Sequence, residues 1–221
     1  MRLVIFDFDG LILDTETPDY DSWRDVFQEF GQELPMAEWA DGIGTKAGAF
    51  DPVACLVQQL GHDLPRHEIE QRRRARFHEL VARQPLQPGV VEYLDAAPQL
   101  GIQLAVASSA TRDWVEGHLD RFGVRGAFAC IKTIEDVARA KPAPDLFNAV
   151  LAELRIPAEE AIVLEDSPNG ILASARAGVY SVAVPNHVTR KLDLSGACLR
   201  IDSLPDWPLA RLLAHARNGR G

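Results

Sequence analysis

Two pairs of acidic residues stand at the ends of apolar runs that read as buried strands. Asp7 and Asp9 close the first run, and Glu165 and Asp166 follow a later one. Residues i and i+2 of a strand point to the same side, so we expect Asp7 and Asp9 to converge. Ligands bind outside the carboxyl ends of strands in open α/β sheets, which predicts that both pairs lie at one edge.

Four carboxyl groups at one edge would form a hard oxygen site suited to Mg²⁺. Like charges placed side by side raise one pKa or demand a cation, and Gly10 permits the tight turn that must follow Asp9. Two structural alternatives stay open. The first pair could merely end a strand and cap the next segment, and Asp166 or Ser167 could cap the helix expected over Ile171–Ala177.

Two further elements could bind a phosphate group. Ser108 and Ser109 follow the apolar run Ile102–Ala107 and precede a helical pattern, where a hydroxyl and free N–H groups bind anions. Lys141 lies between two helical patterns, and Pro142 fixes the turn after it. Each feature has an ordinary alternative, a serine at a strand end and a lone surface lysine.

The elements that must position these residues alternate between strand and helix. The alternation over residues 100–185 favours an α/β fold with three layers and a mainly parallel sheet. Trp114 belongs to a helical pattern whose apolar residues should share one buried face. The expected strands are Leu3–Phe8, Ile102–Ala107, Ala161–Leu164, Val179–Val184 and a weaker one near Ala129–Lys132.

Residues 16–85 interrupt this rhythm with helical patterns and no convincing strand. These patterns cover Ser22–Phe30, Pro52–Leu60 and Arg66–Arg83. We therefore expect residues 1–15 and 86–221 to form the α/β core, with residues 16–85 as a small α-helical cap inserted after the first strand. A last helical stretch, Leu204–Ala216, should pack on the core.

Composition excludes several classes of protein. The 221 residues are 47% hydrophobic and 25% charged, which is typical of a globular chain and not of a disordered one. Acidic residues outnumber basic ones 32 to 23, so a nucleic-acid partner is disfavoured. Neither a membrane span nor an export signal is predicted. Three widely spaced cysteines, with no metal-binding pattern, favour a cytoplasmic protein.

Four segments together resemble the haloacid dehalogenase (HAD) superfamily, in its phosphatase and phosphomutase branch. They read DFDGLILD, VASSA, AKPAPD and EDSPNG, in that order along the chain. The resemblance implies a Rossmann-like core with an inserted cap. It also implies that Asp7 is the nucleophile that becomes an aspartyl-phosphate, that Asp9 is the general acid and base, and that Ser108 and Lys141 hold phosphoryl oxygens.

The resemblance further implies Mg²⁺ as cofactor. The ion would be held by Asp7, by the backbone carbonyl of Asp9 and by Asp166, with Glu165 nearby or acting through water. The chemistry agrees, because a dianionic phosphate approaches an aspartate only when cations offset the repulsion.

The cap should select the substrate. Glu16 and Asp19 are candidates that face the core, and Lys46 and Arg73 are the cationic substrate contacts that we expect, together with Ser109 in the core. Asp19 stands where β-phosphoglucomutases carry a gating histidine, which favours hydrolysis over transfer. We therefore predict a phosphatase that acts on a small phosphorylated metabolite such as a sugar phosphate.

Other functions remain as alternatives. A phosphomutase is the first of them, whereas a haloalkanoate dehalogenase would need neither the second aspartate nor a metal cluster. A receiver domain carries its phospho-accepting aspartate on a middle strand and has no cap. A binding protein or phospho-aspartate switch on the same scaffold would release little phosphate. We expect a cytoplasmic monomer that binds neither nucleic acid nor membrane.

Overall fold

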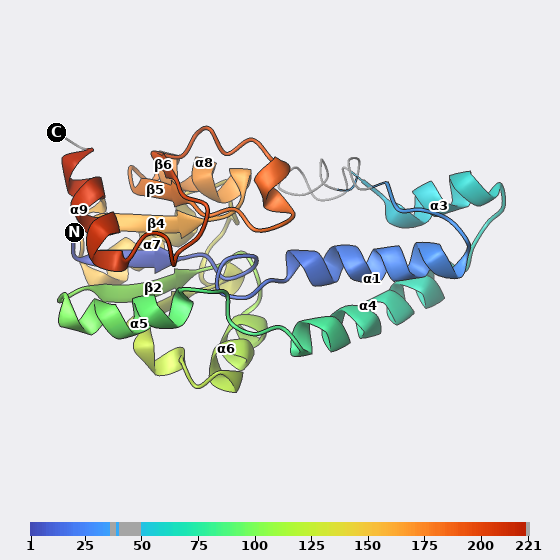
Figure 1. The fold of residues 1–221 in the computed structure, drawn as a ribbon, viewed down its shortest axis with the longest axis horizontal. Coiled ribbons are helices and arrows are strands. Elements are labelled where there is room, and N and C mark those ends of the chain that lie inside the picture. The colour runs from blue at the N-terminus through green and yellow to red at the C-terminus, as the bar shows by residue number, and fades with distance from the viewer. Residues whose placement is uncertain (36–38, 40–49, 220–221) are drawn as a thin grey trace.

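The structure, a computed structural model, describes residues 1–35, 39 and 50–219. Within these residues, parallel strands form one sheet in the order β3-β2-β1-β4-β5-β6, with β1 at its centre (Figure 1). This confirms the predicted α/β class and the parallel sheet. The strands are β1 (Leu3–Phe6), β2 (Gln103–Ala107), β3 (Cys130–Lys132), β4 (Ala161–Glu165), β5 (Tyr180–Ala183) and β6 (Leu199–Arg200).

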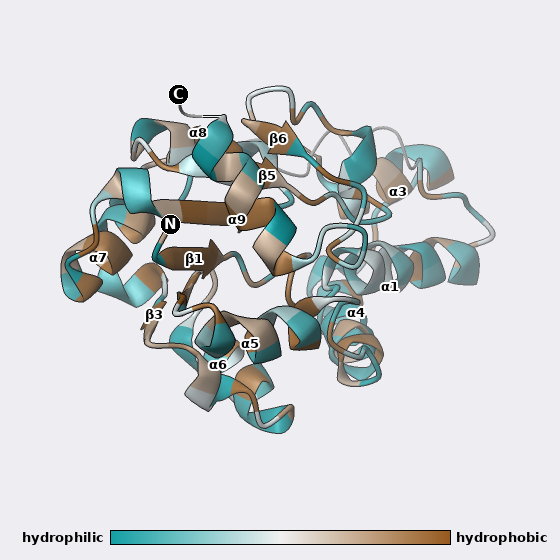
Figure 2. Cartoon of the chain, turned by 60° about the vertical axis from the view of Figure 1, so that its left-hand side comes forward, coloured by the Kyte–Doolittle hydropathy of each residue, from teal (hydrophilic) through white to brown (hydrophobic). Residues whose placement is uncertain are grey.

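Helices cover both faces of the sheet, which explains why its strands read as continuous apolar runs. Along β1, Val4 and Phe6 pack into one core cluster and Leu3 and Ile5 into the other, because successive side chains point to opposite faces. Figure 2 shows β1 in the brown of hydrophobic residues. One face is covered by α5 (Val90–Gln99), α6 (Arg112–Arg121) and α9 (Leu209–Asn218), and the other by α7 (Asp145–Leu154) and α8 (Pro168–Arg176).

A helical insertion follows β1, as predicted, and extends away from the sheet (Figure 1). It contains α1 (Glu16–Glu29), α3 (Pro52–Leu60) and α4 (Arg66–Ala82), and α1 packs along α4. Phe27 and Leu56 are fully buried in a hydrophobic cluster that belongs mainly to this insertion. No helix in the described ranges combines the length and the apolar character that crossing a bilayer requires.

The two connections between core and insertion lie side by side. Leu13 on the way out forms a bridge with Leu86 on the way back, and the Gln87 N–H donates to the Ile12 carbonyl at 2.9 Å. Just before this pair, Gly10 turns the chain at φ +77°, and its N–H donates to the Leu13 carbonyl at 2.8 Å. The insertion therefore leaves and rejoins the core next to the end of β1.

Some elements differ from the sequence prediction. Helix α1 begins at Glu16 rather than at Ser22. The sequence prediction missed its first turns because they are polar and carry no apolar periodicity. Helix α9 begins at Leu209, after Pro208, rather than at Leu204. Strand β6, which has only two residues, was not predicted. Helix α5 was not predicted either, although the buried residues of α5 have helical spacing.

Candidate active site

The predicted core residues come together at the carboxyl edge of the sheet. Asp7 and Asp9 follow β1, Ser108 follows β2, and Asp166 follows β4. This is the edge at which parallel α/β sheets bind ligands. A cavity of about 230 Å³ lies there, lined by Asp7, Asp9, Glu16, Ser108, Ser109, Lys141, Asp166, Ser167, Asn169 and Thr189.

Lys141 reaches into this edge from the loop before α7. Its Nζ lies 2.6 Å from Asp7 Oδ1 and 2.6 Å from Glu165 Oε1, and its side chain is only 6% exposed. Burial alone would lower the pKa of Lys141, but the charges of Asp7 and Glu165 outweigh burial and raise it. The alternative of a lone surface lysine is therefore wrong, and the site holds a permanent cation beside Asp7.

Three buried carboxylates form an acidic cluster here. Ligand oxygens of Asp7, Glu165 and Asp166 lie within 4.8 Å of one another. Burial and the charge of Glu165 raise the pKa of Asp7 to about 7, in spite of Lys141. Burial and the charge of Asp7 likewise raise the pKa of Asp166. One lysine does not balance three carboxylates, so the cluster has the charge and the oxygen donors that a hard divalent cation requires.

Gly10 lies directly against the acidic cluster, where a side chain would collide with Asp166. A Cβ at this position would lie 2.1 Å from Asp166 Oδ2 and 2.7 Å from Asn186 Nδ2. Only glycine leaves this space open while holding a positive φ. The space that the absent side chain of Gly10 leaves for the Asp166 carboxylate is a second observation, besides the donor set, that fits these residues to a metal ion such as Mg²⁺.

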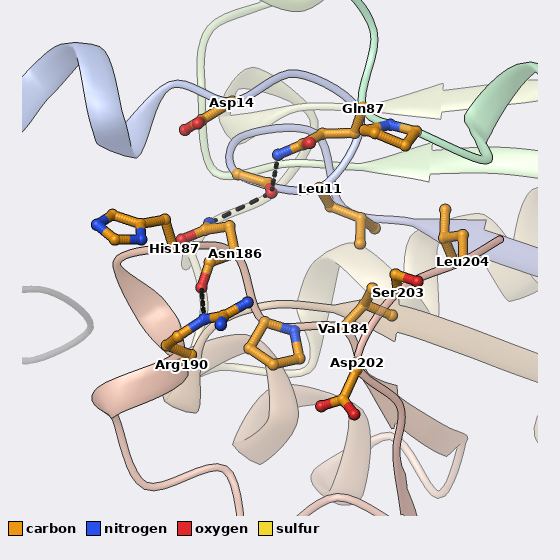
Figure 3. A pocket seen from close by; sticks show the side chains of 13 residues that line it. Leu11, Asp14, Gln87, Val184, Asn186, His187, Arg190, Asp202, Ser203 and Leu204 are labelled. Atoms are coloured by element: carbon orange, nitrogen blue, oxygen red, sulfur yellow. Dashed lines mark hydrogen bonds between the residues drawn. The ribbon is translucent and has the colours of Figure 1, made fainter. Parts of the chain in front are cut away.

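Asn186, which the sequence analysis missed, supports the cluster from the loop after β5. Its Nδ2 donates to Asp166 Oδ2 at 2.7 Å and to the Gly10 carbonyl at 3.3 Å. A neighbouring cavity of about 270 Å³ is shown in Figure 3, where Gln87 also donates to Gly10 and Arg190 donates to the Asn186 carbonyl. A polar residue just past a strand of this sheet was the available signal.

Ser167 is the helix-capping residue, a choice between Asp166 and Ser167 that the sequence left open. Its hydroxyl accepts from the Gly170 N–H at 3.0 Å and so caps α8, which begins at Pro168. The same hydroxyl donates to Glu165 Oε2 at 2.9 Å. A Cβ on Gly170 would lie 1.8 Å from the Glu165 carboxyl group. Helix α8 therefore packs directly against the acidic cluster. The helix N-cap at Ser167 and the acidic cluster are both present.

Asp9 is held by a residue that the sequence analysis placed on a buried helix face. Trp114, in the first turn of α6, is half-buried, and its Nε1–H donates to Asp9 Oδ1 at 2.9 Å. Ser108 Oγ lies 3.5 Å from the other carboxylate oxygen. Burial raises the pKa of Asp9, and the indole hydrogen bond opposes that rise. Helical periodicity alone could not identify Trp114 as a partner of Asp9.

A third cavity, of about 580 Å³, extends from Asp9 towards the insertion. Arg73 of α4 forms an ion pair there with Asp19 of α1, and its guanidinium lies 5.1 Å from the Trp23 ring centroid. Burial and the charge of Asp9 raise the pKa of Glu16 to about 8. Lys46 lies outside the described residues. The lining residues are Asp9, Thr15, Glu16, Asp19, Arg73, Arg74, Phe77, His78, Ser109, Ala110, Thr111 and Trp114.

Comparisons with known proteins show which family the chain is similar to. The sequence profile of the haloacid dehalogenase-like hydrolases matches residues 4–184. YhcW of Bacillus subtilis (strain 168) is 41% identical over 215 residues, which are 97% of each chain. Hexitol phosphatase B of Escherichia coli (strain K12) is 32% identical over 186 residues, 82% of each chain. A CbbY mutant from Rhodobacter sphaeroides, solved with xylulose-(1,5)bisphosphate, has a TM-score of 0.73 at 30% identity and covers 96% of this chain and 99% of its own.

Proposed function

This chain belongs to the haloacid dehalogenase-like hydrolases and is a phosphatase of that family, and from this premise we propose that it hydrolyses a small sugar phosphate, with Mg²⁺, through an aspartyl-phosphate intermediate. One observation carries the proposal. Lys141 pairs with Asp7 within the buried acidic cluster, and Asp9 lines the same cavity as Asp7.

In the first step, a carboxylate oxygen of Asp7 attacks phosphorus, and the bond from phosphorus to the sugar oxygen breaks. Asp9 gives its proton to that departing oxygen, which leaves as an alcohol. Lys141 pairs with the phosphoryl oxygens and offsets the charge that accumulates there, and Ser108 and Ser109 donate hydrogen bonds to them.

In the second step, Asp9 acts as a base. Its carboxylate takes a proton from water while the water oxygen attacks phosphorus, and the bond from phosphorus to Asp7 breaks. Inorganic phosphate leaves and both aspartates return to their starting states. One group thus serves as acid and then as base, which requires it to stay within hydrogen-bond reach of both oxygens.

Mg²⁺ would be held by Asp7, by the Asp9 backbone carbonyl and by Asp166, with Glu165 nearby or acting through water. Bound there, the ion would supply positive charge to the phosphoryl oxygens. Glu165 would act chiefly on Lys141, because its Oε1 holds Nζ at 2.6 Å and its Oε2 accepts from Ser167.

We assign the cap to residues 16–85. The residues that line the cavity between Asp9 and this cap support the proposal of a hydroxylated substrate. Glu16 and Asp19 offer carboxyl groups that can form hydrogen bonds with sugar hydroxyls, and Arg73 offers a cation for a second anionic group. Lys46 is proposed as a further cationic contact. The names of relatives point the same way, since one is a hexitol phosphatase and another was solved with a sugar bisphosphate.

Hydrolysis is favoured over phosphoryl transfer between sugars by the residue at position 19. A mutase of the β-phosphoglucomutase type carries a gating histidine there, whereas this chain has Asp19 in an ion pair with Arg73. A carboxylate held in this way is not a histidine-like proton gate for Asp9. Water is then the acceptor of the phosphoryl group.

The experiment that tests the proposal measures phosphate release from a panel of sugar and nucleoside monophosphates, with Mg²⁺ and with excess EDTA. The panel includes β-glucose 1-phosphate, with glucose 6-phosphate followed as a separate product. Metal-dependent phosphate release is the expected result. Isomerised sugar phosphate without release would make the protein a mutase, and a protein that binds these esters without turnover would refute catalysis.

A further inference from the structure

Trp114 donates its indole N–H to the residue that we propose as the general acid. The N–H points at Asp9 Oδ1, 2.9 Å away, and the half-buried ring lines the cavity that extends from Asp9. An indole is a donor only, so it holds a carboxylate oxygen and never competes with it for a proton. The contact therefore restrains the Asp9 carboxyl group.

The ring of Trp114 is also packed against the cap. It stacks on Phe77 of α4, with ring centroids 5.7 Å apart and an interplanar angle of 15°. It meets His78 of α4 edge-on at 5.7 Å and His118 of α6 edge-on at 4.4 Å. One side chain from the core thus contacts both a catalytic carboxyl group and a cap helix.

Together with hydrogen bonds from Thr15 and Ser108, the indole contact would set which Asp9 oxygen faces the reacting phosphate. With Oδ1 bound to the indole, Oδ2 is the oxygen that lies 3.5 Å from Ser108 Oγ, beside the cavity that also holds Asp7. A general acid works only when its proton lies within hydrogen-bond reach of the leaving oxygen. A carboxyl group free to rotate would spend part of its time in an unproductive orientation.

We propose that Trp114 is a positioning residue that fixes the Asp9 carboxyl group for proton transfer to the leaving group and connects this orientation to the cap through Phe77. The inference rests on the proposed role of Asp9 as general acid. It predicts a loss that depends on how much the leaving group needs a proton. A general structural role would instead slow all substrates alike.

The test compares Trp114→Phe with the wild-type protein on phenyl phosphate and p-nitrophenyl phosphate, both with saturating Mg²⁺. The two esters have similar shapes, but phenolate is the more basic leaving group and needs the proton more. The ratio kcat/KM is measured because it covers the steps up to departure of the leaving group and not the hydrolysis that both esters share. Phenylalanine keeps an aromatic ring against Phe77 and loses the N–H donor.

The matched control is Trp207→Phe. Trp207 contacts Arg211 and His215 of α9 and does not line the cavities at Asp9. A second variant, Phe77→Leu, keeps the donor and removes the aromatic stack with the cap helix.

For Trp114→Phe we expect kcat/KM to fall about tenfold more on phenyl phosphate than on p-nitrophenyl phosphate, a part of the ~10²–10⁴-fold that general acid catalysis supplies. Phe77→Leu should shift the ratio the same way by a smaller factor, and Trp207→Phe should not shift it. Equal losses on both esters, or no loss on either, would overturn the assignment of Trp114. An unshifted ratio in Phe77→Leu would overturn the connection to the cap. A wild-type protein that cleaves neither these esters nor any sugar phosphate of the panel above would refute the proposed function instead.

Discussion

Replacing Gly10 with alanine should weaken metal binding far more than it weakens the fold. The residue has φ +77°, so a side chain there costs about 1–2 kcal/mol in backbone strain. The added Cβ would lie 2.1 Å from Asp166 Oδ2, whereas ordinary van der Waals contact begins at 3.4 Å. The Asp166 carboxylate must therefore retreat by more than an ångström from its present place in the acidic cluster.

The chain offers a matched control for the strain alone. Gly61, at the end of α3, has φ +74° and nothing within 4 Å of the Cβ that alanine would add. Gly61→Ala and Gly10→Ala should therefore lose similar backbone energy, about 1–2 kcal/mol each. Of the two, only Gly10→Ala should also displace Asp166, the proposed metal ligand, and disturb its hydrogen bond with Asn186.

The assay is a Mg²⁺ titration of phosphate release, paired with thermal unfolding in Mg²⁺ and in EDTA. Disturbing the support of metal ligands costs roughly 10–100-fold in metal affinity, so Gly10→Ala should need about that much more Mg²⁺ for half-maximal activity. Its unfolding temperature should also respond less to Mg²⁺ than that of Gly61→Ala. Wild-type Mg²⁺ dependence in Gly10→Ala, or an equal loss in Gly61→Ala, would refute the placement of the metal beside Asp166.

Three further predictions concern the proposed catalytic and cap residues. Asp7→Asn should abolish turnover, and near-normal turnover of this variant would contradict the mechanism. Asp9→Asn should still form phosphoenzyme with an activated ester but hydrolyse the phosphoenzyme slowly. Intact-protein mass spectrometry detects the accumulated phosphoenzyme. Arg73→Gln should lower kcat/KM about tenfold or more for a sugar bisphosphate relative to a monophosphate, as expected from losing one buried charged contact; an unchanged ratio, measured by phosphate release, would remove Arg73 from the substrate site. The pKa of Asp7 is raised to about 7 by burial and by Glu165, so the folded metal-free protein holds a proton that the unfolded chain has lost above about pH 4. Unfolding melts in EDTA should therefore show stability falling as pH rises from about 4 to 7, and the stabilisation by Mg²⁺ growing over the same range; a Mg²⁺ effect independent of pH would contradict this.

The sheet and the acidic edge were predictable because both depend on local signals. A strand buried on both faces must be apolar throughout, and the residue pair at i and i+2 fixes the common direction of Asp7 and Asp9. The position of Lys141 needed more than this, since its loop carries no periodic pattern. Its pairing with Asp7 and Glu165 depends on how that loop crosses the sheet edge.

The parts that escaped prediction involve long-range contacts of ordinary residues. Trp114 fits a buried helix face by spacing, and only the tertiary fold brings its N–H to Asp9. Asn186 lies 20 residues beyond Asp166, in a loop without a motif, yet it donates to that carboxylate. The start of helix α1 was missed because its first-turn residues Glu16 and Asp19 are polar and give no apolar periodicity. Both residues line the cavity beside Asp9.

The adjacent connections at Leu13 and Leu86 have a consequence for how such a protein can diversify. Since the insertion leaves and rejoins the core at neighbouring residues, its length can change without stretching the sheet or altering the strand order. If the insertion selects the substrate, as we propose, the proposed catalytic residues and the choice of substrate lie on segments that can be exchanged separately. Recombination could graft another insertion between these two points and redirect the enzyme to a new ester while the acidic edge stays as it is.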